Sequence, residues 1–371
     1  MLEKRKWCPM SVASLESYSS YVREVDGECS FLRSWNSLLF SGSRSGEVAC
    51  WDISTGIEMW RVDFEGPCSD AECNDGMLFF TESDSVHAIS KTSGEVIWSV
   101  KLEGSSDYVK VAGGFVWVTT SVYNFEIQDY SEGAVWQIDF EGIILNKWET
   151  VGRAWSLSEQ EGKLVLGLSR PKSGFAIVSE SGLEYPDIED LAPVTIGNGG
   201  GSISVVLGHS NGTVSEIVDH QVKSVSHVGS SVRAIDYFDG WVVGLDSGNI
   251  TSSENFGSWS VNLDGIVDVI GFGPSLDTRR GVWASSWRGS ESAIFLINPR
   301  GGGVELEMSH HSRIGSIFSG GEWICFGDDD GCIFVVEGDV LRRRFSRSVE
   351  EIEEDEGSLE LRRKIRALRG S

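Results

Sequence analysis

Three consecutive carboxylates form the most conspicuous group of possible ligands in the sequence. Asp328, Asp329 and Asp330 offer the oxygen atoms that Ca²⁺ prefers in proteins. They precede Gly331, however, and Asp followed by Gly is also typical of a tight hairpin turn. The corresponding stretch of an earlier, similar segment is 44–46, Arg-Ser-Gly, which contains no carboxylate. We therefore interpret the Asp run as a turn and not as a cation site.

Other spacings that could support chemistry are weaker still. Cys68 and Cys73 have no second Cys or His pair nearby, as a zinc site would require. The six histidines show no ligand spacing, and we interpret the adjacent His310 and His311 as part of a polar loop. The Gly-rich stretch 197–201 precedes a predicted strand, not the helix whose N-terminus would bind phosphate. The sequence thus predicts no catalytic residue, no cofactor and no metal ion.

A repeat of about 40 residues organises the chain. Two segments align without gaps at an offset of 38 residues, with Val48 on Val86, Gly56 on Gly94 and Trp60 on Trp98. Six weaker copies follow, and the first strands of the eight units are expected near residues 38, 77, 115, 163, 202, 241, 282 and 323. The units contain short apolar runs, and most of them also contain Ser-Gly, Asn-Gly or Asp-Gly turns, which predicts antiparallel strands joined by hairpins.

Repeats of this length predict an all-β fold, a closed β-propeller of four-stranded antiparallel blades. Eight units favour eight blades, with seven as the alternative if one unit is degenerate. Residues 1–341 would form the propeller, and residues 10–35 would contribute a strand that closes the ring. Four tryptophans, Trp60, Trp98, Trp148 and Trp259, end blade units and are expected to pack between blades.

The repeat resembles that of the pyrroloquinoline-quinone-like (PQQ-like) propellers. Asp52, Gly56 and Trp60 match that family's Asp, Gly and Trp positions, and the second unit matches at Gly94 and Trp98. The dipeptide at 51–52 also resembles the Trp-Asp pair of WD40 blades. The resemblance implies a propeller, and it raises the possibility of a quinone enzyme. Such enzymes hold the cofactor with bases, an acid and calcium over a Trp floor, a set that we cannot assign in this sequence.

Charge and cysteine content bear on partners and compartment. The net charge is −25, and nucleic-acid binding by an acidic propeller is disfavoured because it repels phosphates. Seven cysteines, an odd number, are expected to be reduced, and no apolar run of about 20 residues could cross a membrane. The basic first residues lack an apolar core behind them, so we expect no secretory signal and a cytoplasmic location.

The last 30 residues, 342–371, differ from the rest in charge and in period. They hold nine basic and seven acidic residues, whereas the rest of the chain holds 22 basic and 49 acidic residues. Ser358 can cap a short helix in which Leu361, Ile365 and Leu368 form one apolar stripe. Basic residues lie beside that stripe. We expect Leu361, Arg362, Ile365, Arg366 and Leu368 to bind a partner protein's groove or an anionic surface.

These observations favour a non-catalytic, intracellular protein-interaction scaffold. The alternative is a propeller enzyme or small-ligand binder that uses the central channel. Converging polar side chains in the channel would favour the alternative, whereas an exposed apolar patch on one face would favour the scaffold.

Overall fold

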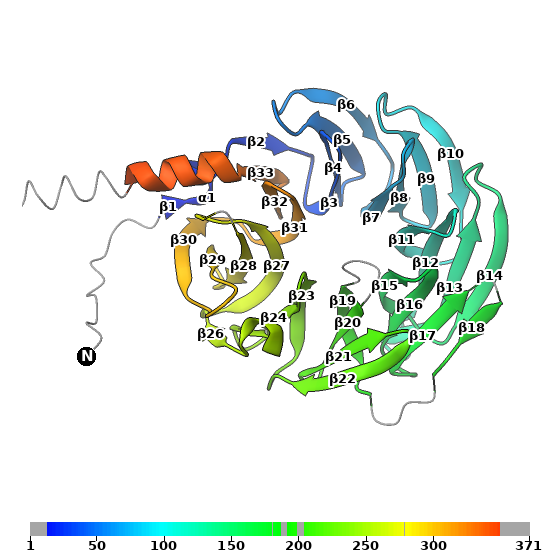
Figure 1. The fold of residues 1–371 in the computed structure, drawn as a ribbon. Helices are drawn as coiled ribbons and strands as arrows, with labels where there is room; N and C mark the ends of the chain where they lie inside the picture. The colour runs from blue at the N-terminus through cyan, green and yellow to red at the C-terminus, as the bar shows by residue number, and fades with distance from the viewer. Residues whose placement is uncertain (1–12, 180, 187–190, 199–203, 278, 349–371) are drawn as a thin grey trace, which may run out of the picture.

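The computed structural model describes residues 13–179, 181–186, 191–198, 204–277 and 279–348, which form eight sheets arranged in a ring (Figure 1). Each sheet is one blade built on four antiparallel strands, and the sheet of blade 7 has a fifth strand that pairs parallel at its outer edge. The innermost strands of neighbouring blades contact one another all the way around. The prediction of a closed eight-bladed propeller is therefore confirmed. Ring closure leaves only short strand edges, those of the innermost strands at the centre of the ring and those of the outermost strands at its rim.

In the first half of the ring, the chain runs through each blade from the innermost strand to the outermost. Blade 1 comprises β3 (Cys29–Trp35), β4 (Leu38–Ser43), β5 (Glu47–Asp52) and β6 (Glu58–Asp63). Blade 2 comprises β7 (Cys68–Cys73), β8 (Met77–Glu82), β9 (Ser85–Ser90) and β10 (Val96–Lys101). Blade 3 comprises β11 (Ser105–Ala112), β12 (Phe115–Asn124), β13 (Asp129–Ile138) and β14 (Ile144–Thr150). Blade 4 comprises β15 (Ala154–Gln160), β16 (Lys163–Leu168), β17 (Gly174–Ser179) and β18 (Gly182–Glu184).

The second half of the ring repeats the arrangement. Blade 5 comprises β19 (Val194–Asn198), β20 (Ser204–His209), β21 (Thr213–Val218) and β22 (Gln221–His227). Blade 6 comprises β23 (Val232–Tyr237), β24 (Trp241–Leu245), β25 (Asn249–Ser252) and β26 (Ser260–Asn262), with a short 3₁₀ helix at Glu254–Phe256. Blade 7 comprises β27 (Ile266–Pro274), β28 (Arg280–Trp287), β29 (Ser292–Ile297) and β30 (Val304–His310). Blade 8 contains β31 (Ile314–Gly320), β32 (Trp323–Asp328) and β33 (Cys332–Glu337).

The N-terminal segment completes the last two blades. β2 (Tyr21–Glu24) pairs antiparallel with β33 and is the outermost strand of blade 8. β1 (Ala13–Ser14) pairs parallel with β30 at the outer edge of blade 7, and the short helix α1 (Leu15–Tyr18) joins the two strands. The first and last parts of the propeller are thereby hydrogen-bonded into common sheets.

The sequence-based assignment of strands within each unit was wrong in one respect. The expected first strands near residues 38, 77 and 115 are the second strands of their blades, β4, β8 and β12. An innermost strand precedes each of them. The sequence does not reveal these inner strands because charged residues interrupt their apolar pattern, as Asp70 does in β7.

Tryptophans pack between blades, as predicted. The indole N–H of Trp60 donates to the backbone oxygen of Lys91 in blade 2 at 2.8 Å, and that of Trp98 donates to Phe140 in blade 3 at 2.9 Å. A Cβ on Gly94 would lie 2.8 Å from the Trp60 ring, and the φ of Gly94 is +71°, so both space and conformation require glycine there.

A helix over residues 338–348 follows β33 directly and packs on the last blades (Figure 1). Leu341 is completely buried in the cluster that contains Leu15, and Phe345 packs against the same cluster. The guanidinium of Arg344 donates to the backbone oxygens of Ser17 and Ser19 at 2.9 and 2.6 Å. The described helix therefore joins the propeller at its N-terminal segment. No helix among the described residues is long and apolar enough to cross a membrane.

Candidate functional site

A β-bulge near the start of each innermost strand places polar groups at the contacts between blades. The pairing of β7 with β8 shifts between Cys68 and Ala71, and the other seven innermost strands shift at comparable places. Asp70, Asp107 and Asp268 lie within these bulges. Since a bulge re-aims the side chain it carries, the repeated bulge explains why these carboxylates point to a neighbouring blade.

Each of these carboxylates pairs with an arginine associated with an adjacent blade. Asp70 lies 2.5 Å from a guanidinium nitrogen of Arg33, and Asp107 lies 2.7 Å from Arg153. A third pair, Asp268 with Arg313, is bidentate, with contacts of 2.5 and 2.8 Å. These charges hold blades together and are therefore not free to converge on a substrate.

Burial changes the proton affinity of two of these acids. It raises the pKa of Asp107 to about 6, although Arg153 and a hydrogen bond from Ser121 act in the opposite direction. Burial also raises the pKa of Asp70 on balance, against the opposing effects of Arg33 and Lys110. Both carboxyls are costly to ionise in the folded chain, as expected for buried groups.

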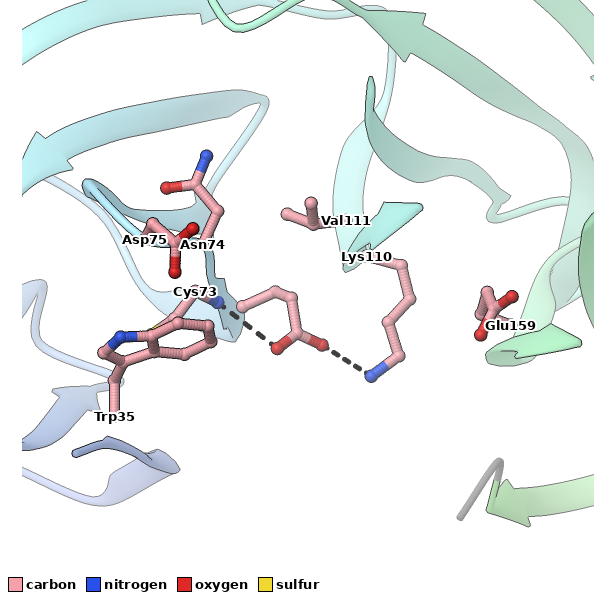
Figure 2. Close-up of a pocket in the computed structure, with 8 residues that line it drawn as sticks. Trp35, Cys73, Asn74, Asp75, Lys110, Val111 and Glu159 are labelled. Atoms are coloured by element: carbon pink, nitrogen blue, oxygen red, sulfur yellow. Dashed lines mark hydrogen bonds and ion pairs between the residues drawn. The ribbon is translucent and has the colours of Figure 1, made fainter. Parts of the chain in front are cut away.

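A cavity of about 390 Å³ lies where four innermost strands of blades 1–4 end. It is lined by Trp35, Glu72, Cys73, Asn74, Asp75, Lys110, Val111 and Glu159. Figure 2 shows Trp35 and Glu159 on opposite sides of the cavity, with Lys110 between them. An aromatic wall beside separated charges could bind a small polar ligand.

The central acid of this cavity already has partners. Glu72 lies 2.6 Å from the Lys110 ammonium and accepts a hydrogen bond from the backbone N–H of Cys73 at 3.2 Å (Figure 2). Burial acts to raise the pKa of Glu72, but Lys110 and Arg33 lower it on balance. A carboxylate held ionised and paired in this way is a poor general base, so the cavity is better suited to binding than to proton transfer.

A second feature lies on the outer edge of blades 1–3. The outermost strands β6, β10 and β14 each contain a bulge, and the extra residue is Met59, Ile97 or Leu145. These side chains are 51%, 52% and 44% exposed. The same bulge carries Lys223 in blade 5 and Glu305 in blade 7. Of the five blades with this bulge, the three consecutive blades 1–3 thus have an aliphatic side chain at the extra residue, and blades 5 and 7 have a charged one.

Further exposed aliphatic residues flank these three. They are Ile57, Val96, Ile143 and Ile144, each at least 41% exposed. We call the seven residues the aliphatic row. Figure 1 shows β6, β10 and β14 following one another along the outer edge of the ring, so the row spans adjacent blades. An exposed apolar surface of this kind is typical of a protein-binding site.

Blade 3 also carries a long hairpin. β12 and β13 have ten residues each and are longer than the corresponding strands of the other blades. Phe125 at its tip is 85% exposed and Ile127 is 61% exposed. The Phe125 ring packs edge-on against Tyr123, with centroids 5.2 Å apart. The hairpin therefore presents a second apolar surface on the same blade.

The residues singled out in the sequence have different outcomes. The Asp run is a turn, as interpreted, because Asp328 accepts hydrogen bonds from the backbone N–H groups of Asp330 and Cys332. Cys68 and Cys73 are buried free thiols of β7. The assignment of His310 to a polar loop was wrong, because this residue ends β30 with its side chain completely buried. The predicted partner-binding residues 361–368 lie outside the described residues.

Comparisons with known proteins agree with this architecture. A family model described as outer membrane protein assembly factor BamB matches residues 33–118. Over these residues the chain is similar to that family, and the whole described chain is a β-propeller. The matched segment runs from within β3 through blade 2 and into β12 of blade 3, and it includes the two units in which the repeat motif is clearest. No curated protein matches the chain by sequence.

Solved structures extend the likeness around the whole ring. A computationally designed protein, Ika8, superposes with a TM-score of 0.69 at 17% identity and covers 85% of this chain and 97% of its own. Sqt1 from Saccharomyces cerevisiae has a TM-score of 0.67 at 14% identity, with 86% of this chain and 98% of Sqt1 covered. BamB from Moraxella catarrhalis has a TM-score of 0.64 at 12% identity, with 86% and 99% covered. Identities this low show the fold alone.

Proposed function

We propose that this protein is a non-catalytic, intracellular protein-interaction scaffold. The observation that carries the proposal is the aliphatic row on the outermost strands of blades 1–3. Aliphatic side chains about half-exposed on three adjacent blades cost solubility, and burial against a partner would recover about 25 cal/mol per Å² of apolar surface. The paired carboxylates of the innermost strands support the same conclusion, since they stabilise blade contacts.

The chemistry around the row indicates the kind of partner. Glu58, Glu95 and Glu141 lie in the same outermost strands or the turns that lead into them, and all are exposed. A partner surface that combines apolar side chains with Lys or Arg would match both features. The family model that matches blades 1 and 2 is named as an assembly factor, which is consistent with a role in binding proteins.

Cysteine chemistry supports an intracellular location. Six cysteines among the described residues are free, and five of them are buried. Burial raises the pKa of Cys50, Cys68 and Cys73 to about 12, so these thiols stay protonated and unreactive. Reduced structural thiols are the usual state in the cytosol.

The row can be tested by charge substitution. Met59→Asp, Ile97→Asp and Leu145→Asp, combined in one chain, should remove the proteins that co-purify with the wild type. Val225→Asp is the matched control, because Val225 is 57% exposed on the outermost strand of blade 5. Retention of every co-purifying protein by the triple variant would contradict the proposal.

The cavity at the channel supports a second candidate, a small-ligand binder or enzyme. The observation that favours this candidate is the cavity of about 390 Å³ that Trp35 lines. Mass spectrometry of material released from denatured protein would reveal a resident small molecule. Loss of that molecule in Glu159→Gln, with the bound proteins unchanged, would favour this alternative.

The C-terminal segment is proposed as a second contact to the partner. Its stripe of Leu361, Ile365 and Leu368, with Arg362 and Arg366 beside it, has the pattern of a helix that docks into a groove. Replacing the three apolar residues with Ser should remove a bound protein and leave the melting temperature of the propeller unchanged. A fall of several degrees with the same bound proteins would instead make the segment part of the propeller.

A further inference from the structure

Glu16, His310 and His311 meet where the N-terminal segment crosses blade 7. Each offers one ligand atom, and the three atoms lie within 4.8 Å of one another. Glu16 belongs to α1, whereas the histidines lie at and just beyond the end of β30. Because 294 residues separate Glu16 from His310, no sequence spacing could indicate this group.

The hydrogen-bond partner of the buried His310 indicates which of its ring nitrogens carries a hydrogen. Nε2 of His310 lies 2.8 Å from a carboxylate oxygen of Asp328, and both side chains are completely buried. The other oxygen of Asp328 accepts backbone N–H groups of its turn. Nε2–H therefore donates to Asp328, and in the neutral form of the ring Nδ1 carries a lone pair.

That lone pair faces a negative charge. Nδ1 of His310 lies 3.3 Å from a carboxylate oxygen of Glu16, yet it is buried and has no hydrogen-bond partner. Two acceptors at this distance repel each other unless a cation lies between them.

We propose that Glu16, His310 and His311 bind a divalent transition-metal ion, for which Zn²⁺ is the best match. Two imidazoles and one carboxylate are a common zinc donor set. Two ligands at about 2.0–2.1 Å from one tetrahedral ion lie about 3.3–3.4 Å apart. The separation of Nδ1 in His310 from the Glu16 oxygen, 3.3 Å, meets that requirement.

The surroundings of both histidines strengthen this assignment. A carboxylate lies beside one ring nitrogen of each, Asp328 for His310 and Asp330, at 3.6 Å, for His311. Carboxylates in this position orient metal-binding histidines and raise their basicity. His311 and Glu16 are exposed or partly exposed, so an ion can reach the group from solvent.

A bound ion would join α1 to blade 7 beside the turn of blade 8. It would thus hold the N-terminal segment against the last two blades, and the stability of the folded chain would rise with the logarithm of the free metal concentration once that exceeds the dissociation constant. The ion would have a structural role, which is compatible with a non-catalytic scaffold.

The test is calorimetric titration of Zn²⁺ into the metal-free full chain at pH 7.5. We expect one ion per chain, and binding weakened roughly tenfold or more in Glu16→Gln and in His311→Ala. His227→Ala and Glu126→Gln are matched controls, since both residues are exposed and distant in the sequence. Both ligand variants replace side chains that are at least 43% exposed, so folding should survive.

Thermal unfolding with and without Zn²⁺ is the second measurement. Zn²⁺ should raise the melting temperature of the wild type and of both controls, but not that of the two ligand variants. Absence of saturable binding, or equal binding by all five chains, would overturn the proposal. A wild type that ignores Zn²⁺ but gains stability as His310 is protonated would show that a proton fills the gap, which also overturns it.

Discussion

The outer sides of the first three blades and of the last two blades differ in how much of their surface the rest of the chain covers. In blades 7 and 8, the closure region, β1 adds a fifth strand to the outer edge of blade 7 and β2 is the outermost strand of blade 8. The helix of residues 338–348 packs on the cluster that contains Leu15. In blades 1–3 the outermost strands β6, β10 and β14 have no further strand beside them and carry the aliphatic row. The N-terminal segment and the helix thus cover part of the outer side of the last two blades, whereas the outermost strands of blades 1–3 expose the aliphatic row.

This difference separates stability from binding. The closure region buries Leu15 and Leu341 completely in one cluster, so substitutions there should destabilise the fold. The row is exposed, so substitutions there should change interactions and not the fold. The innermost strands, by contrast, use similar Asp–Arg pairs in both regions, between blades 1 and 2 and between blades 7 and 8.

The largest effect should follow from emptying the closure cluster. Leu341→Ala is expected to lower the free energy of unfolding by about 2–5 kcal/mol, because it leaves a cavity among buried side chains. Ile97→Ala in the row should change it by no more than about 0.5 kcal/mol. Urea unfolding followed by tryptophan fluorescence measures both. Equal effects would mean that the helix of residues 338–348 does not stabilise the ring.

The next largest effect should come from the pairs between innermost strands. Arg33→Ala and Arg313→Ala each leave a largely buried carboxylate without its arginine, and each should cost about 1–3 kcal/mol. Similar losses would confirm that the two regions differ only at their outer edges. If only Arg313→Ala destabilises the fold, the contact between innermost strands contributes more stability in the closure region than between blades 1 and 2.

A smaller, pH-dependent effect is expected at Asp107. Its pKa is about 6 in the folded chain, against about 3.9 for an unfolded Asp. The folded state therefore binds more protons between these values, and stability contributed by this group falls as pH rises from about 4 to 6. Asp107→Asn should lack that slope. Unfolding free energies of the two chains at pH 4.5 and 6.5 would show it, and parallel pH profiles would contradict it.

The smallest effect on stability should be at the hairpin of blade 3. Phe125→Ser removes a ring that is 85% exposed and should leave the melting temperature unchanged within error. If co-purifying proteins are lost in this variant but not in the triple variant of the row, the binding surface lies at the hairpin of blade 3 and not along its outer edge.

Much of the fold follows from local chemistry in the sequence. Gly46, Gly212 and Gly331 mark hairpin turns with positive φ, and apolar runs at near-constant spacing favoured eight blades over the alternative of seven. Trp60 and Trp98 were recognisable as packing residues because they recur one blade apart with a glycine before each. These features depend on residues close together in the chain, so the sequence expresses them directly.

The remaining features depend on residues far apart in the chain, which only the folded ring brings together. Charged residues such as Arg33 and Asp70 interrupt the apolar pattern of the innermost strands, so the sequence does not predict these strands. They become recognisable only when the folded ring pairs their charges between neighbouring blades. The row emerged only from strand register, which shows that Met59, Ile97 and Leu145 occupy the same bulge. The meeting of Glu16 with His310 required the ring to close, which brings the first described residues of the chain against its seventh blade.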